Sequence, residues 1–166
     1  MAYQLNFEGK ALDAYNAMVA ERIATAMKEG NLARDDLTVR MLRPEDLGLS
    51  NPEFTFSITA AQWNTSQIST TVSNNRWIGI NGIILEETAT PSAGTQLKFK
   101  LAGRDARYWQ IQGINTTQNS TLFFQDPLTV DANTNITMDI YGKTTDTDYR
   151  LVLLGVVVEK KGILTM

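Results

Sequence analysis

The spacing of apolar residues changes once along the chain, close to residue 36. Before that point, apolar side chains recur every three or four positions, which is the period of one face of an α-helix. They are Leu12, Tyr15, Val19, Ile23 and Met27. Charged residues such as Arg22 flank this stripe, and Gly30 stands where a left-handed C-cap would end a helix. The pattern predicts one α-helix between Glu8 and Gly30.

Beyond residue 36 the apolar residues alternate with polar ones, as they do in half-buried β-strands. The first two sets are Leu37, Val39 and Met41, and then Phe54, Phe56 and Ile58. The same signal predicts strands at residues 68–72, 77–85, 97–101, 108–114, 121–125, 136–141 and 149–159. The stretch 151–158 is almost continuously apolar, which is typical of a central strand buried on both faces.

Small and polar residues mark the predicted breaks between these strands. Asn74 and Asn75 form a plausible tight turn, and Gly79 and Gly82 indicate a bulge or a close backbone contact within one strand. Residues 115–120 and 142–148 are predicted to be polar loops. About eight to ten short strands at this spacing favour a sandwich or a barrel.

The predicted fold is mainly β, an antiparallel β-sandwich or jelly-roll preceded by one N-terminal α-helix. We divide the chain into an N-terminal arm with its amphipathic helix, residues 1–36, and a β-sandwich domain, residues 37–166. A chain of 166 residues can bury a substantial core. It therefore needs no disulfide or metal to fold, and it contains no cysteine to form either.

Composition argues for binding or assembly and against an enzyme. The chain has neither histidine nor cysteine, so the usual acid–base catalyst and the thiolate nucleophile are both missing. A net charge of -3 argues against nucleic acid as a partner, because phosphate backbones attract basic surfaces. No apolar run approaches the roughly 20 residues of a membrane span, and the N-terminus is not patterned as a signal peptide. We expect a soluble, cytoplasmically made protein with no membrane partner.

Carboxylates are the remaining candidates for chemistry. Glu86 and Glu87 are adjacent, and neighbouring residues on a strand point to opposite faces, which disfavours a shared catalytic site. Asp146 and Asp148 could offer oxygens to Ca²⁺, but turn formation explains aspartates in loops more simply. Glycine-rich nucleotide motifs are absent. We therefore predict no catalytic, cofactor-binding or metal-binding residues, and a carboxylate hydrolase ranks below the other hypotheses.

Basic and aromatic residues leave two alternatives open. Lys98, Lys100, Arg104 and Arg107 form the densest basic patch, which we interpret as a solvated face or an intersubunit salt-bridge region. The three tryptophans, Trp63, Trp77 and Trp109, either fill the core or, if exposed on a sandwich, stack on sugar rings. Core filling is the commoner role of such large side chains.

The C-terminal half resembles a viral protein family. Its sequence PLTVDANTNITMDIYGKTTDTDYRLVLLGVVVEKKG contains a polar loop, an alternating strand, a second polar loop and a long apolar strand. This arrangement is similar to the closing hairpins of bacteriophage head decoration, or cement, proteins and of small single jelly-roll capsid proteins. The resemblance covers about residues 77–162. It implies an oligomer, often a homotrimer, that clamps neighbouring subunits of the major capsid protein on the virion surface after assembly in the host cytoplasm.

The sequence therefore favours a capsid decoration protein that stabilises the head. Its helix would dock on a neighbouring subunit through Leu12, Tyr15, Val19, Ile23 and Met27, although the same stripe could instead pack on the sheet of its own subunit. The alternative function is a carbohydrate-binding or receptor-binding sandwich in a phage tail or host-recognition apparatus. A line of coplanar exposed Trp or Tyr rings on the sandwich would favour that alternative.

Overall fold

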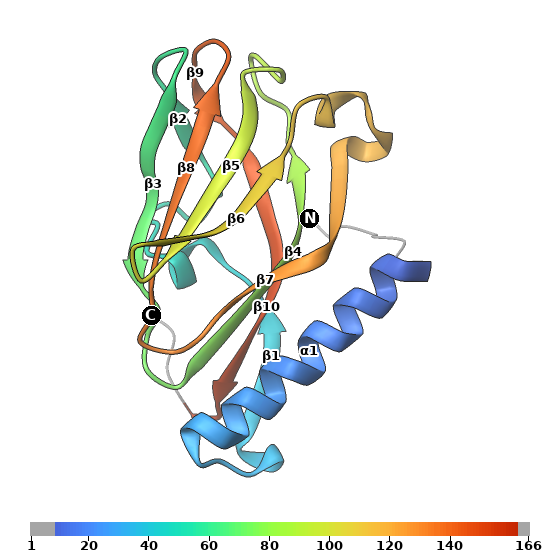
Figure 1. Ribbon diagram of the computed structural model, residues 1–166, viewed down its shortest axis with the longest axis vertical. Helices are drawn as coiled ribbons and strands as arrows, with labels where there is room; N and C mark the ends of the chain where they lie inside the picture. Colours follow the sequence, from blue (N-terminus) through green and yellow to red (C-terminus); the bar gives the residue numbers. More distant parts are fainter. Residues whose placement is uncertain (1–8, 163–166) are drawn as a thin grey trace.

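A computed structural model, which describes residues 9–162, has two antiparallel four-stranded sheets and one long helix (Figure 1). The helix α1 spans Gly9–Gly30. The strands are β1 (Leu37–Met41), β2 (Phe56–Ile58), β3 (Trp63–Thr71), β4 (Arg76–Leu85), β5 (Gly94–Leu101), β6 (Arg104–Gln110), β7 (Thr121–Val130), β8 (Asn135–Gly142), β9 (Asp146–Tyr149) and β10 (Leu151–Lys160). Four short 3-10 helices occur at Arg34–Asp36, Pro44–Leu47, Ile114–Thr116 and Gln118–Ser120.

The strands pair in a nested order. The first sheet has the order β1-β10-β4-β7, the second has the order β3-β8-β5-β6, and β2 pairs with β9 in a small separate ladder. Thus β1 pairs with β10, β2 with β9, β3 with β8, β4 with β7 and β5 with β6. The chain is one long hairpin, closed between β5 and β6 and rolled into two sheets. This is a jelly-roll, so the predicted fold class is confirmed.

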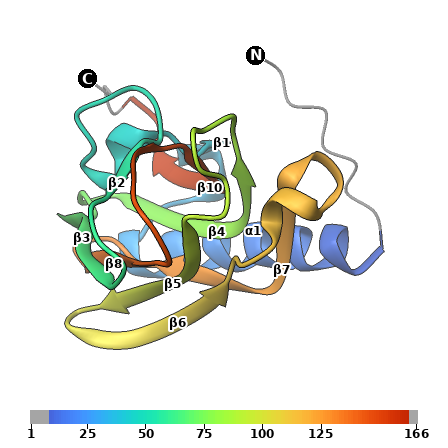
Figure 2. The same cartoon turned by 90° about the horizontal axis from the view of Figure 1, so that it is seen from above.

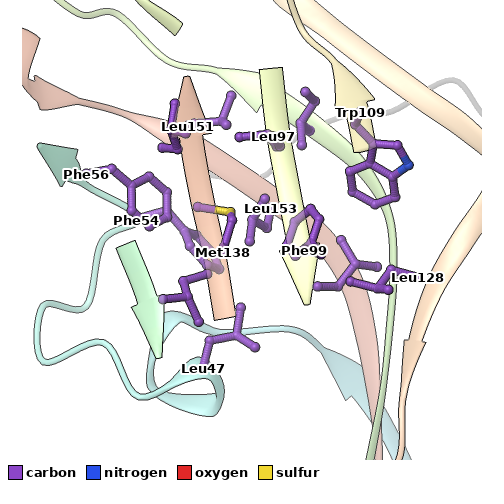
Figure 3. Close-up of a cluster of buried hydrophobic side chains, with 14 of the residues drawn as sticks. Leu47, Phe54, Phe56, Leu97, Phe99, Trp109, Leu128, Met138, Leu151 and Leu153 are labelled. Atoms are coloured by element: carbon purple, nitrogen blue, oxygen red, sulfur yellow. The ribbon is translucent and has the colours of Figure 1, made fainter. Parts of the chain in front are cut away.

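The hydrophobic core lies between the two sheets (Figure 3). Alternation along each strand sends every second side chain inward, as Leu97 and Phe99 of β5 show. The inward side chains labelled in Figure 3 are Leu47, Phe54, Phe56, Leu97, Phe99, Trp109, Leu128, Met138, Leu151 and Leu153. They come from both sheets and from the segments that close the ends of the sandwich.

Strand β10 is buried on both faces, as its apolar sequence predicts. Leu153 and Val157 point into the core, whereas Val158 packs in a smaller cluster beneath the helix with Ala26 and Trp77. Between β1 and β4, β10 has a hydrogen-bonded neighbour on each side. It therefore organises the first sheet.

The helix forms an outer layer against the first sheet, on β4, β7 and β10 (Figures 1 and 2). Its fully buried side chains are Met18, Arg22 and Ala26. Gly79 of β4 lies directly below Met18, since a Cβ added there would meet the Met18 sulfur at 2.7 Å. Glycine at this position therefore lets the helix approach the sheet closely. Within residues 9–162, no helix is long and apolar enough to cross a membrane.

Several predicted boundaries are corrected by the structure. The left-handed residue that ends the helix is Asn31, with φ of 51°, and not Gly30. The predicted loop 142–148 contains the start of β9, whose Asp146 is buried, because this polar segment pairs with β2. Strand β7 continues through Pro127, which is tolerated because β7 is the edge of its sheet. The bulge predicted near Gly79 and Gly82 is confirmed by a register shift between Ile80 and Gly82.

Candidate binding surfaces

The predicted docking stripe of the helix lies along the margin of its contact with the sheet. Leu12 and Met27 are 37% and 38% exposed. Tyr15, Val19 and Ile23 are partly buried, and Ile23 packs against the cluster beneath the helix. The helix therefore packs on its own subunit, which is one of the two alternatives that the sequence left open. Docking of the exposed margin on a neighbour stays a prediction.

Arg22 fixes the helix to β7, although the sequence predicted it to be a polar flank. Its guanidinium is buried, donates to Asp131 Oδ1 at 2.7 Å and to the Val130 carbonyl at 3.1 Å, and is paired with Glu21 at 2.6 Å. Burial alone would lower the pKa of Arg22, but the hydrogen bonds to Glu21 and Asp131 raise it overall. The cation is thus fully paired and contributes to the fold.

An apolar surface surrounds the edge strand β1. Val39 and Met41 point away from the core, and they are 38% and 66% exposed. Between them and the helix lies a hollow of about 250 Å³, lined also by Tyr15, Leu154 and Val156. Sequence alternation placed Val39 and Met41 on the same face of a strand, but it could not show that the helix leaves this part of the sheet uncovered.

A second hollow, of about 390 Å³, also has Met41 in its lining. Pro44, Phe54 and Val152 are among its apolar lining residues, and Arg43, Glu53 and Glu86 are its charged ones. Because Met41 and Leu154 line both hollows, the two hollows are adjacent. We call Val39, Met41 and the linings of these two hollows the β1 surface.

A groove of a different character lies on the outer face of the second sheet. It is open, has a volume of about 500 Å³, and is bordered by Trp63 of β3 and Tyr141 of β8. Their ring centroids are 5.3 Å apart and their planes are inclined by 79°, so the two rings meet edge to face and are not the coplanar line expected of a sugar-binding sandwich. The amide side chains of Gln96, Gln110 and Gln112 and the ammonium group of Lys143 line the rest of the groove. We call these six residues the aromatic groove.

Lys98 holds one wall of the aromatic groove in place. Its Nζ lies 4.7 Å from the centroid of the Trp63 ring and 5.8 Å from that of Tyr108. Cation–π attraction at these distances fixes the orientation of Trp63. Of the three tryptophans, Trp77 and Trp109 are buried as core side chains, and Trp63 alone is partly exposed.

The carboxylates that the sequence singled out take part in local structure. Within residues 9–162, no group of three His, Cys, Asp or Glu side chains converges as a metal site would require. Asp146 is engaged in turn formation, because it accepts hydrogen bonds from Thr88 Oγ1 and from the backbone N–H groups of Thr90 and Asp148. Glu86 and Glu87 follow the end of β4, where the Glu86 N–H donates to the Arg150 carbonyl at 2.9 Å.

Comparison with known proteins identifies no family. No family model matches the chain, and no curated protein matches it. Among solved structures, the chain is similar to the C-terminal CBM6 of LamC, a marine laminarinase from Zobellia galactanivorans, at 12% identity, with 74% of this chain and 100% of that chain covered and a TM-score of 0.31. It is also similar to dimeric latent PorU from Porphyromonas gingivalis, at 10% identity and a TM-score of 0.31. That match covers 75% of this chain and 12% of that chain. At these values the likeness carries no argument about function.

Proposed function

We propose that the chain is a virion structural protein, a capsid decoration protein that binds across neighbouring subunits of the major capsid protein. The observation that carries the proposal is the β1 surface, where Met41 is 66% exposed beside two hollows lined mainly by apolar residues. Contiguous apolar surface of this kind is typical of protein interaction sites. The β1 surface supplies contact area, as stabilisation of a shell requires.

The free edge of β1 is partly capped by charged side chains. β1 pairs with β10 on one side only, and an open strand edge can accept a partner strand. Arg34 Nη1 donates to the Leu37 carbonyl at 3.4 Å, and Arg40 Nη1 donates to the Met41 carbonyl at 3.2 Å. Charged side chains on an edge disfavour strand addition. The exposed side chains of Val39 and Met41, and not the strand edge, therefore support a partner that binds side by side with this sheet face.

Self-association is part of the same proposal. A homotrimer on the virion surface would place several β1 surfaces against the capsid at once, and linked contacts give large avidity from modest individual affinities. The exposed side chains of Arg43 and Glu53, which line the second hollow, would add specificity at the polar rim of the contact.

A pair of matched double variants tests which apolar surface mediates assembly. Val39→Glu with Met41→Glu places two charges on the β1 surface, and Leu12→Glu with Met27→Glu places two charges on the helix margin. We expect the first double variant to lose binding to capsids of the encoding virus by at least about tenfold, because two hot-spot side chains are lost. The second should bind within about twofold of the parent. Co-sedimentation measures binding, and light scattering measures native mass.

A cooperative thermal unfolding transition, at a midpoint close to that of the parent protein, would show that each variant is folded. A parent protein that stays at the monomer mass of 18.5 kDa and never sediments with capsids would contradict the assembly proposal. Loss of binding only in the helix variant would move the interface from β1 to α1.

A second candidate function, carbohydrate or receptor recognition in a phage tail or host-recognition apparatus, is favoured by the aromatic groove. Trp63 and Tyr141 are aromatic side chains left accessible on a polar sheet face. Their position opposite the β1 surface allows both functions in one molecule.

A further inference from the structure

We infer that the aromatic groove binds a chain of neutral pyranose sugars across the second sheet, with Tyr141 as the stacking surface, Trp63 as a fixed aromatic wall beside it and glutamine amides as hydroxyl partners. This inference rests on the second candidate function and is independent of the β1 surface. It assigns a ligand class and the individual residues that recognise it.

The groove is built by strand register. Trp63 of β3 is paired with Tyr141 of β8, Tyr141 with Gln96 of β5, and Gln96 with Gln110 of β6. Directly paired residues point to the same face of a sheet, so the four side chains form one row across four strands. At a strand spacing of about 4.8 Å, the row is about 14 Å long, enough for a short oligosaccharide.

The row faces solvent and not the core. Leu97, Ile140 and Trp109, which follow or precede members of the row along their strands, are buried between the sheets. Because side chains alternate along a strand, the members of the row point outward. Tyr141 is 38% exposed, so its ring is accessible to a ligand.

The chemistry of the groove matches that of a sugar. A pyranose ring has apolar C–H faces and a rim of hydroxyl groups. The exposed ring of Tyr141 offers an apolar surface for a C–H face of the sugar, and Trp63 stands nearly perpendicular to it as a side wall. Each glutamine amide offers donors and an acceptor for the sugar hydroxyl groups. Gln110 Nε2 donates to Gln112 Oε1 at 3.1 Å, which orients this pair. Within residues 9–162, the amide of Gln96 makes no side-chain hydrogen bond and remains available.

The groove is also preorganised. Lys98 Nζ, on the Trp63 ring at 4.7 Å, restricts that side chain before any ligand arrives. Less rotamer entropy is then lost on binding. Fixed aromatic walls with a few placed polar groups are typical of ligand sites.

Charge distinguishes the ligand class. Lys143 is the only charged residue that lines the described groove, and Lys98 is engaged with two aromatic rings. Recognition of a nucleic acid or of a polyanionic glycan would need several cations along the row. A neutral polyol is therefore the ligand that the groove favours.

The test uses the intact chain on a glycan array, followed by titration calorimetry with soluble laminarin and dextran as neutral probes and alginate as an acidic probe. We expect at least one neutral glycan to bind. Tyr141→Ala should weaken that binding by at least about tenfold, and Gln96→Ala by about threefold, since each removes a direct contact. Tyr141→Phe keeps the ring and should stay within about threefold of the parent.

The control is Lys28→Ala, at an exposed position of the helix outside both proposed surfaces, which should leave sugar binding unchanged. Absence of binding to every neutral glycan on the array, or binding that Tyr141→Ala and Gln96→Ala both leave intact, would overturn the inference. Binding to alginate alone would overturn the assignment of a neutral ligand. Capsid co-sedimentation of the same Tyr141 variants reports on the β1 surface separately, so the two proposals fail or succeed independently.

Discussion

The buried charged side chains on and beside the first sheet are paired with side chains of opposite charge. Glu159 lies between Arg40 and Arg76, with N–O distances of 2.9 and 3.2 Å, and Arg40 also reaches Asp46 at 2.7 Å. Burial would lower the pKa of Arg40, but its hydrogen bonds, foremost the one to Asp46, raise it. Such groups remain in a fold because removing one partner leaves the other buried and unpaired.

Asp146 shows the same principle at a turn. Burial of this carboxyl would raise its pKa, yet hydrogen bonds from Thr88 Oγ1 and from the N–H groups of Thr90 and Asp148 lower the pKa below its ordinary value. These bonds favour the charged form and tie the loop after β4 to β9. The carboxyl that the sequence offered as a possible calcium ligand is thus a structural acceptor.

The lowered pKa of Asp146 predicts a specific acid dependence. A depressed pKa in the folded state stabilises the fold above the unfolded pKa of about 3.9, and this stabilisation is lost as the pH falls through the folded pKa. Asp146→Asn should reduce the free energy of unfolding by about 1 kcal/mol near neutral pH. The difference between parent and variant should shrink as the pH falls below about 4. Urea unfolding across this range measures it, and a difference that stays constant with pH would contradict the assignment.

At the scale of elements, the contact between the helix and the first sheet depends on one close approach. Met18 lies over Gly79, where a Cβ would sit 2.7 Å from its sulfur. The helix is further held by Arg22 and by Trp77 Nε1, which donates to Glu29 at 2.9 Å. These polar contacts, one in the middle of the buried helix face and one near the C-terminal end of the helix, fix the position of the helix along the sheet.

A double-mutant cycle tests this close approach. Gly79→Ala should destabilise the protein by about 1 to 3 kcal/mol, because the added methyl group overpacks the contact with Met18. Met18→Ala alone should cost about 2 to 5 kcal/mol through the cavity it leaves. In the double variant the new methyl partly fills that cavity, so the total loss should fall below the sum by about 1 kcal/mol or more. Additive losses in urea unfolding would contradict the contact.

The helix also illustrates what the sequence predicts and what it does not. Its existence and extent follow from the apolar period, which is a local property. The face that it buries depends on the surface it meets. That surface contains Gly79, which admits Met18, and the Val130 carbonyl with Asp131, which accept hydrogen bonds from Arg22. None of these partners is near the helix in sequence, so Arg22 was predicted to be a flank.

At the scale of the molecule, nested pairing makes most contacts distant in sequence. β1 must pair with β10, and β3 with β8, before either sheet is complete. Bringing such distant strands together lowers the chain entropy before the new contacts can offset the loss, so folds dominated by these contacts form slowly. The jelly-roll order itself was predictable only as a class, because alternation identifies strands and not their partners.

Folding should therefore be slow, with refolding on a timescale of about milliseconds to seconds or longer. Stopped-flow tryptophan fluorescence measures the rate, since Trp77 and Trp109 become buried. A helix variant such as Leu12→Glu, on the exposed margin, serves as a control that should leave the rate unchanged within about twofold, as surface substitutions have small effects. Refolding within microseconds would contradict the dependence on distant pairing.

The same limit applies to the aromatic groove. Trp63 and Tyr141 are distant in sequence, and Gln96 and Gln110 belong to a different hairpin. Their residue types are common in polar strands, and only the register of β3, β8, β5 and β6 brings them into one row. The sequence predicted that an exposed tryptophan would matter, but it could not identify which of the three was exposed.

The two uncovered regions lie on opposite outer sides of the sandwich, since Met41 belongs to the first sheet and Tyr141 to the second (Figure 1). A particle coated through the first sheet would therefore turn every groove toward the surrounding medium. Each copy would bind a cell-wall polysaccharide with low affinity. Many copies on one particle would bind at the same time, so the particle as a whole would stay on its host with high avidity.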